Sequence, residues 1–294
     1  MPTTGGSRRR RSPDAYAIAS VDKAVRLLLT LGHMPGRAAG ITELAHRLQL
    51  TKNQVFRLLK TLERHRLVDQ DPGGSLYRLG SGLLVLAAMA RDGLQLVRAA
   101  SPTLDRLAMA TGESIHLAAR EGLEAVIVDV RESLHPVRLT AQVGGRYPLH
   151  AGACPRAILA FLPPEQQEQV FRALPRLPRY TRRTVEDPEA LRRELDAIRQ
   201  RGYAISDEDV DLGARAVGAP IFAAGPSPSA DGGTWALQAV GALSIAGPTV
   251  RLPDPVLARY GEMVAAAARE ISNRLGARAA VPAIPGADGE EGAR

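Results

Sequence analysis

Side chains that can donate hydrogen bonds to base edges and phosphate groups are concentrated between residues 51 and 60. They are Lys52, Asn53, Gln54, Arg57 and Lys60. Arg and Lys pair well with guanine, Asn and Gln pair well with adenine, and all four types reach phosphate oxygens. The segment therefore has the side chains for nucleic-acid recognition, provided that one element of secondary structure presents them together.

Two short helices joined by a tight turn are predicted around this segment. Apolar residues recur at helical spacing in both, so each helix has one stripe to bury. The stripes are Leu44, Ala45 and Leu48 in the first helix and Val55, Leu58, Leu59 and Leu62 in the second. Thr51 and Gln54 have the spacing of a capping box, which predicts that the second helix begins there. With its stripe buried, the second helix points the polar cluster outward.

A two-stranded wing is predicted after the second helix. Turn-forming residues fill positions 69–74, and residues 76–79, which include Arg78, can return as the second strand. An additional helix is expected after Ser20, packed beneath the pair. Its inward face is expected to be Val21, Val25, Leu28 and Leu29. Amphipathic helix pairs also occur in domains that never contact nucleic acid, but the tight turn, the polar cluster and the wing together favour a DNA-binding winged helix-turn-helix.

Positive charge is confined to the amino-terminal third of the chain. Residues 1–99 contain 16 Lys and Arg against 7 Asp and Glu, a net charge of +9, whereas residues 100–294 contain 22 against 24, a net charge of −2. Basic side chains that neutralise phosphates release counterions and so supply sequence-independent affinity for DNA. A polyanionic partner is therefore expected for the first third only.

Neither disulfide bonds nor membrane insertion is predicted. Cys154 is the only cysteine, which excludes an intramolecular disulfide and a structural zinc site made of several thiolates. The amino terminus lacks the apolar stretch of a signal peptide, and no apolar run approaches the length of a membrane span. We therefore expect a soluble cytoplasmic protein.

Three segments are expected to flank or join two folded domains, which span residues 15–80 and 100–276. Residues 1–14 include four consecutive arginines and should be a disordered tail, either solvated or following the DNA backbone or minor groove. Residues 81–99 should form a linker helix, which either supports dimerisation or packs on its own domain. Residues 277–294 should be a flexible tail.

The second domain is predicted to be α+β. Ser101 and Pro102 have the pattern of a helix start, and short strand and helix patterns follow. Strands are expected at 114–119, 125–130, 203–206, 216–222 and 235–245, helices at 155–161, 188–201 and 254–275, and loops at 144–150 and 224–233. Such elements around an antiparallel sheet are typical of a ligand-binding α+β domain.

The order of these segments resembles the IclR family of bacterial transcriptional regulators over residues 16–276. The amino-terminal segments that carry the resemblance are TELAHRLQLTKNQVFRLLKTLE and LVDQDPGGSLYRLG. The carboxy-terminal segments are GESIHLAAREG, RYPLHAGACPRAILAFLP, DPEALRRELDAIRQRGYAISDEDVDLGARAVGAPI and ALSIAGP. The resemblance implies a winged helix-turn-helix joined by a linker helix to a GAF-like α+β effector-binding domain. It further implies a homodimer or homotetramer that binds double-stranded operator DNA and acts as a repressor.

The expected DNA contacts lie on the second helix and the wing. They are Thr51, Lys52, Asn53, Gln54, Arg57, Lys60 and Arg78. Residues 52, 53, 54 and 57 should contact bases and nearby phosphates, while Lys60, Arg78 and the tail arginines should contact phosphates. An alternative is a small-molecule sensor that acts through a protein partner and uses its amino-terminal domain for dimerisation. Steep loss of DNA affinity with salt would count against that alternative.

The resemblance also implies a small-molecule site against the sheet of the second domain. The implied effector contacts are His116, Ala153, Cys154, Arg156, Ser206, Asp207, Ala216, Ser244 and Ala246. Family members that take small polar carboxylates tend to have polar groups at all four strand positions 206, 216, 244 and 246, whereas only two are polar here. Fewer donors suit a partly apolar or aromatic effector. His116, Arg156 and Arg215 could orient a carboxylate on it, or Arg215 could form a structural ion pair.

Two features could suggest catalysis or metal binding, and both have simpler interpretations. His150 and Cys154 are four residues apart, but nearby prolines and a glycine disfavour a continuous helix, and no third ligand or orienting residue has recognisable spacing. The acidic residues at 207–211 lack the spacing of an EF-hand, so a solvated acidic turn is expected. We therefore predict no enzyme activity, no metal and no cofactor.

Overall fold

The computed structural model describes residues 17–226 and 235–277, and it divides into two compact units between Gly93 and Leu94. The arginine tail, most of the expected loop at 224–233 and nearly all of the carboxy-terminal tail lie outside the described residues. Within residues 17–226 and 235–277, no helix combines the length and apolarity needed to cross a bilayer.

The amino-terminal unit is a winged helix-turn-helix, as predicted. Its helices are α1 (Ala19–His33), α2 (Ile41–Leu48), α3 (Lys52–Arg64) and α4 (Gly82–Gly93), with a short 3-10 turn at Pro35–Arg37. Its small antiparallel sheet has the order β1 (Ala38–Ala39), β3 (Tyr77–Leu79) and β2 (Val68–Gln70). The predicted stripes of α2 and α3 enter the core, where Leu44, Val55 and Leu59 are fully buried.

The inward face predicted for the first helix is correct at Leu28, which packs against the core, and wrong at the other three positions. Val21, Val25 and Leu29 are 56%, 48% and 60% exposed, while Leu27 and Leu31 are fully buried. The helix is apolar on adjoining faces, so the 3.6-residue period alone does not select which face packs on α2 and α3. The helix also begins slightly earlier than expected, at Ala19 rather than after Ser20.

The boundary between the linker helix and the second domain also differs from the prediction. The helix expected over residues 81–99 is interrupted at Leu94, and α5 runs from Gln95 to Thr111 through Pro102, which was expected to start a helix. Proline within a helix removes one backbone hydrogen bond. The apolar side chains of α5, which include Leu96 and Leu104, pack on the sheet. The free energy gained from their burial offsets this loss.

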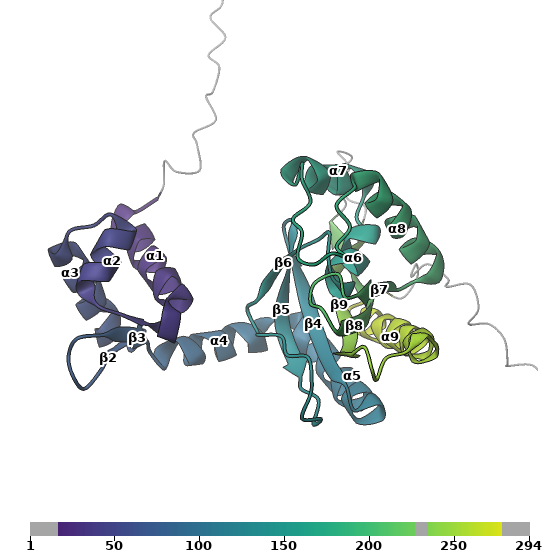
Figure 1. The fold of residues 1–294 in the computed structure, drawn as a ribbon, viewed down its shortest axis with the longest axis horizontal. Helices are drawn as coiled ribbons and strands as arrows, with labels where there is room; N and C mark the ends of the chain where they lie inside the picture. Colours follow the sequence, from purple (N-terminus) through teal and green to yellow (C-terminus); the bar gives the residue numbers. More distant parts are fainter. Residues whose placement is uncertain (1–16, 227–234, 278–294) are drawn as a thin grey trace, which may run out of the picture. The chain divides into compact units, whose positions relative to one another are not determined.

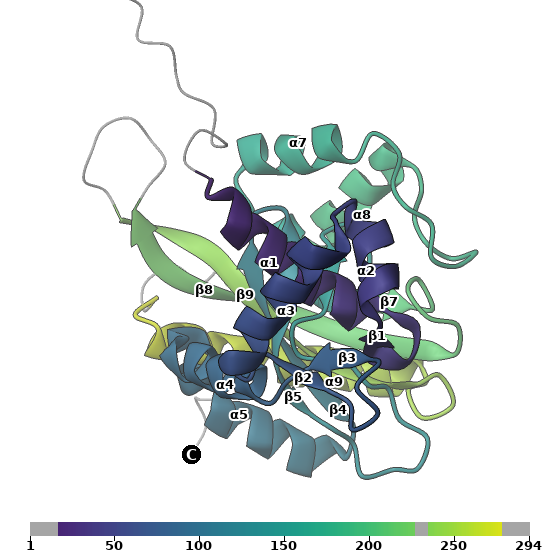
Figure 2. The same ribbon diagram turned by 90° about the vertical axis from the view of Figure 1, so that its left-hand side faces the viewer.

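The carboxy-terminal unit is built on a six-stranded antiparallel sheet, which confirms the α+β prediction. The strand order is β6 (Arg146–Pro148), β5 (Glu124–Arg131), β4 (Ser114–Glu121), β9 (Trp235–Pro248), β8 (Ala214–Pro226) and β7 (Ala204–Asp207). The edge strand β6 was expected to be a loop. In Figure 2, β8 and β9 form the long hairpin within this sheet.

Helices cover both faces of this sheet and give it two hydrophobic cores (Figure 1). One face carries α5 and α9 (Asp254–Arg274). The other carries α6 (Ala153–Ala160), α7 (Pro164–Ala173) and α8 (Pro188–Arg201). Helix α6 lies against β8 and β9, so the residues at its amino-terminal end lie close to the middle of the sheet.

Candidate functional site

The start of α3 is fixed by the predicted capping box. The Thr51 hydroxyl accepts a hydrogen bond from the Gln54 backbone N–H at 3.2 Å, and the Gln54 side-chain oxygen accepts one from the Thr51 N–H at 3.1 Å. These bonds satisfy two donors that a helix start otherwise leaves without partners. They also engage the Gln54 Oε1 atom, so the amide nitrogen is the polar atom of this side chain that the capping box leaves unused.

Replacing Thr51 by alanine should loosen the first turn of α3. Loss of a threonine cap costs about 1 kcal/mol, which corresponds to roughly fivefold faster amide exchange. Hydrogen exchange of the Gln54 and Val55 amides, which donate to the Thr51 side chain and carbonyl, measures this effect in the full chain. Thr51→Ser keeps the hydroxyl oxygen and should restore protection, and equal exchange in the alanine variant and the parent would contradict the role of the box.

The polar cluster of α3 is presented to solvent as predicted. Lys52, Asn53 and Arg57 are exposed, and none of them has an ion-pair or side-chain hydrogen-bond partner within residues 17–226 and 235–277. Lys60 differs, since its Nζ atom lies 2.8 Å from Glu63 Oε2 and 3.0 Å from Gln70 Oε1. The hydrogen bond to Glu63 raises the pKa of Lys60. Lys60 thus connects α3 to the wing and is the least free of these donors.

The wing is held by its own turn and keeps Arg78 exposed. Asp71 Oδ1 accepts hydrogen bonds from the backbone N–H groups of Ser75 and Leu76, at 3.0 and 2.9 Å. Arg78 lies on the central strand β3, opposite Ala38 and Asp69. The structure thus has an exposed basic helix and an exposed basic strand in the same unit.

A cavity of about 120 Å³ lies in the carboxy-terminal unit at the amino-terminal end of α6. Seven of the nine predicted effector contacts line it. They are His116, Ala153, Cys154, Ser206, Ala216, Ser244 and Ala246. Strand register brings most of them together: His116 lies opposite Ser244, and Ala216 lies between Ser206 on β7 and Ala246 on β9. Arg156 and Asp207 are not among the residues that line the cavity.

Sequence reasoning missed several apolar walls of the cavity. They include Ile127, Leu139, Ala141, Tyr147 and Val210. Tyr147 lies within the quoted segment RYPLHAGACPRA, so its proximity to Cys154 was a usable signal. No pattern marked Leu139 or Ala141, because they lie in a connection whose place over the sheet depends on long-range contacts such as the Ser114 hydroxyl donating to the Leu139 carbonyl at 2.6 Å.

Two lining side chains have strongly shifted pKa values, and burial is the cause of both shifts. Burial lowers the pKa of His116 to about 4, so the imidazole is uncharged at neutral pH. Its Nε2 atom is buried and has no hydrogen-bond partner among the described residues. Burial raises the pKa of the Cys154 thiol to about 12, although a hydrogen bond with Ser244 acts in the opposite direction. Cys154 is therefore a protonated thiol rather than a nucleophile.

Cys154 should resist thiol reagents until the protein unfolds. Thiolate is the reactive form, and a buried thiol with a pKa of about 12 is almost entirely protonated at pH 8. Since Cys154 is the only cysteine, reaction with Ellman's reagent reports on it alone. We expect negligible release of the chromophore from native protein and one equivalent in 8 M urea, roughly the concentration that unfolds most domains. Stoichiometric reaction of the native protein within minutes would contradict the burial.

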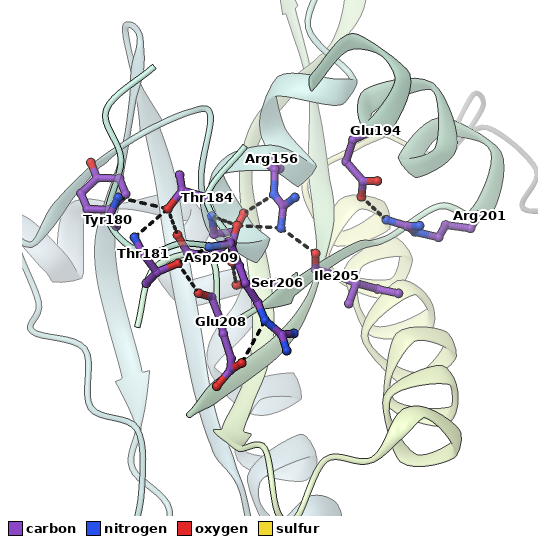
Figure 3. Close-up of polar contacts among 12 residues, drawn as sticks. Arg156, Tyr180, Thr181, Thr184, Glu194, Arg201, Ile205, Ser206, Glu208 and Asp209 are labelled. Atoms are coloured by element: carbon purple, nitrogen blue, oxygen red, sulfur yellow. Dashed lines mark hydrogen bonds and ion pairs between the residues drawn. The ribbon is translucent and has the colours of Figure 1, made fainter. Parts of the chain in front are cut away.

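Arg156, which was expected to contact the effector, does not line the cavity. Its side chain is buried, with Nη2 2.8 Å from Asp209 Oδ2 and 2.6 Å from the Ile205 carbonyl (Figure 3). Asp209 also accepts hydrogen bonds from the Gly152 N–H and the Ser206 hydroxyl. This buried pair holds the start of α6 and the strand β7 together behind the cavity wall.

The acidic segment after β7 is not the solvated turn that was expected. Asp209 is 4% exposed, and Asp207 and Glu208 both pair with Arg183, at 2.6 and 3.1 Å. Hydroxyl groups of Thr181 and Thr184 donate to the backbone carbonyls of Glu208 and Asp209 (Figure 3). Of these acidic side chains, Asp211 is the exposed one.

Arg215 forms a structural ion pair, which was one of its two expected roles. Its Nη2 lies 2.7 Å from Asp254 Oδ1, and its Nη1 donates to the Leu252 carbonyl at 2.8 Å. Its Nε lies 2.9 Å from Asp207 Oδ1, in an orientation that is electrostatically favourable but is not a hydrogen bond. Although Arg215 lines the cavity, its charge is shared by two carboxylates.

The pair of His150 and Cys154 does not form a catalytic arrangement. Helix α6 begins at Ala153, after His150, and the His150 Nε2 atom is 2.8 Å from the Pro178 carbonyl, while its ring stacks on Tyr180. Within the described part of the chain, no group of three or more His, Cys, Asp or Glu side chains could hold a metal ion.

Comparisons with known proteins agree with both units. The family model described as bacterial transcriptional regulator IclR C-terminal matches residues 88–273, and the IclR helix-turn-helix domain matches residues 20–72. The HTH-type transcriptional regulator KipR of Bacillus subtilis is 33% identical over 257 residues, which cover 87% of this chain and 97% of KipR.

Two solved structures have the same fold. An IclR transcriptional regulator from Alicyclobacillus acidocaldarius has a TM-score of 0.74 and 28% identity, with 89% of this chain and 100% of that chain covered. An IclR homolog from Microbacterium hydrocarbonoxydans, solved with 4-hydroxybenzoate, has a TM-score of 0.71 and 27% identity, with 88% and 99% covered. With a capped basic helix, a wing and a cavity in a second α+β unit, this chain is a transcriptional regulator rather than an enzyme, and it belongs to the IclR family.

Proposed function

We propose that this regulator is a ligand-responsive repressor, located in the cytoplasm, that binds a specific operator sequence. The observation that carries the proposal is the exposed face of α3, where Lys52, Asn53 and Arg57 have no competing partners among the described residues. Side chains of these types read base edges when a helix lies in the major groove. Related proteins include the transcriptional repressor IclR of Escherichia coli, which supports repression.

We assign the DNA contacts to exposed side chains, and we rank these by the hydrogen bonds and ion pairs that they already make within the protein. Lys52, Asn53 and Arg57 contact bases and adjacent phosphates, and Gln54 contributes its amide nitrogen. Arg78 contacts a phosphate from the wing, and Lys60 does so less strongly because Glu63 and Gln70 hold it. Thr51 acts mainly by fixing the helix start.

The proposal assigns one task to each part of the chain. Residues 15–80 bind DNA, residues 81–99 connect the units, and residues 100–276 hold the effector. Helix α4 supports a homodimer or homotetramer, because Leu84, Met89 and their apolar neighbours are exposed and lack a covering element within the described chain. A dimer would set the spacing of two half-sites on the operator.

The effector is proposed to be a small, partly apolar or aromatic molecule. A cavity of about 150 Å³ lined by apolar side chains can hold benzene, so a cavity of this size suits a single ring. The related structure solved with 4-hydroxybenzoate supports the same size class. Effector binding would favour one of two spacings of the DNA-binding units. The coupling must be reciprocal: if the effector changes the free energy of DNA binding, DNA changes the free energy of effector binding by the same amount.

The proposal is tested by binding of the full-length protein to DNA upstream of its own gene and of the neighbouring genes. Fragments are compared at several salt concentrations with excess competitor DNA. Retention of one short, near-palindromic fragment is expected, with affinity that falls steeply as salt rises. Equal, weak binding to all fragments with no salt dependence would overturn the proposal and favour a sensor that acts through a protein partner.

A further inference from the structure

The charged side chains around the effector cavity restrict which molecules it can hold. Among the described residues that line the cavity, Arg215 and Asp211 carry formal charges at neutral pH. Arg215 is paired with both Asp207 and Asp254, and so its positive charge is already compensated. Asp211 has no ion-pair partner within residues 17–226 and 235–277. The lining therefore has a surplus of negative charge.

The other candidate cations do not change this balance. Arg156 lies behind the cavity wall, where it is buried against Asp209. Arg183 is paired with Asp207 and Glu208. His116 lines the cavity, but burial lowers its pKa to about 4, so it adds no positive charge at neutral pH. Within the described chain, no uncompensated cation is available to a buried carboxylate.

The amino-terminal end of α6 provides donors without requiring a charged ligand. The first N–H groups of a helix have no acceptors inside the helix, and Gly152, Ala153 and Cys154 line the cavity. Gly152 already donates to Asp209, whose carboxylate offsets the positive end of the helix dipole. The remaining N–H groups can pair with a carbonyl or hydroxyl oxygen as well as with a carboxylate. Because Asp209 already occupies this helix end, the end of α6 offers little further free energy to offset the desolvation of a carboxylate.

We propose that the effector is an uncharged, ring-sized compound with a hydrogen-bonding oxygen or nitrogen, rather than a carboxylate. The inference rests on the proposed function, in which this cavity is the effector site. The apolar walls, including Ile127, Leu139 and Ala141, hold the ring. The polar group of the ligand pairs with the first turn of α6, or with His116 or Tyr147, which lack side-chain hydrogen-bond partners among the described residues.

The test compares ligands that have the same shape and differ in charge. The probes are benzamide and benzoate, 4-hydroxybenzamide and 4-hydroxybenzoate, and cyclohexanecarboxamide and cyclohexanecarboxylate, each titrated into the full-length protein by calorimetry at pH 7.5. We expect at least one amide to bind, with about tenfold higher affinity than its carboxylate, because a carboxylate would be buried without a counterion. The proposal is overturned if any carboxylate binds as tightly as its amide, or if no amide binds at millimolar concentration.

A charge variant tests the physical cause of the preference. Asp211→Asn should reduce the amide-to-carboxylate affinity ratio by about threefold, the size expected for one solvent-exposed charge. Glu262→Gln on α9 removes the same charge from an exposed residue that does not line the cavity, and it should leave the ratio unchanged. An equal ratio in both variants and the parent would show that the lining charge does not select the ligand.

Retention of the operator fragment is measured on the same samples, so that the two proposals fail separately. Loss of the ligand preference in protein that still retains its operator would overturn the uncharged effector and leave the repressor intact. Clear amide binding by protein that recognises no DNA fragment would overturn the repressor and leave the ligand class intact.

Discussion

Replacing Arg57 by alanine is expected to reduce operator affinity by about 5- to 150-fold while leaving the protein folded. The side chain is exposed on α3 and has no partner within the described residues, so its removal costs no internal contact. A bidentate contact between arginine and guanine contributes about 1–3 kcal/mol of discrimination, which is the origin of this range. Fluorescence anisotropy with a labelled operator fragment and a scrambled fragment measures both affinity and specificity.

The salt dependence of this variant separates base contact from phosphate contact. A lost base contact lowers affinity for the operator only, whereas a lost phosphate contact weakens both fragments and reduces the salt slope by about one. Arg172→Ala is a matched control, because it removes an exposed arginine from α7 of the other unit. If Arg57→Ala retained full preference for the operator, the orientation assigned to α3 would be wrong.

The DNA-binding unit was predictable because its signals are local. Thr51 and Gln54 are three residues apart and form their capping box without help from distant elements. The stripe of α3 is bordered by polar residues on both sides, so only one orientation buries Val55 and Leu59. Helix α1 lacks such a border. Val21 and Val25 therefore looked as suitable for the core as Leu27 and Leu31, and the choice depended on packing against α2 and α3.

The cavity was predictable in part. The family resemblance identified the strands that line it, and the strand register determines which of their side chains lie opposite one another. The match of Ser206, Ala216 and Ala246 across three strands is a consequence of antiparallel pairing. The role of Arg156 was not predictable, since its partner Asp209 also binds Gly152, 57 positions away in the sequence. The family resemblance implied a ligand contact, whereas the fold directs the guanidinium away from the cavity.

The helix break at Leu94 and the continuation of α5 through Pro102 also depend on packing against distant elements. A serine followed by proline favours a helix start wherever local preferences decide. Here Leu96, Val97 and Leu104 are buried against the sheet, and a helix that began at Ser101 would leave the first two outside it. Burial of large apolar side chains contributes about 1.5–3 kcal/mol each, which is comparable with the cost of one proline inside a helix.

Replacing Asp209 by alanine is expected to cost about 3–5 kcal/mol of stability in the carboxy-terminal unit. The change leaves the Arg156 guanidinium buried without its counterion, and loss of one partner of a buried pair has a cost in this range. The Gly152 N–H and the Ser206 hydroxyl lose their acceptor as well. Urea unfolding followed by the fluorescence of the single tryptophan, Trp235, reports on this unit.

Two further variants separate loss of the charge pair from loss of a side chain. Glu186→Ala removes an exposed carboxylate that lies 3.4 Å from Arg179, and it should shift the unfolding midpoint little because exposed pairs contribute weakly. The double variant Arg156→Met, Asp209→Asn has no unpaired buried charge, so it should be more stable than Asp209→Ala despite carrying more changes. A double variant less stable than Asp209→Ala would mean that hydrogen bonds of Arg156, such as the one to Ile205, outweigh its charge in holding α6 against β7.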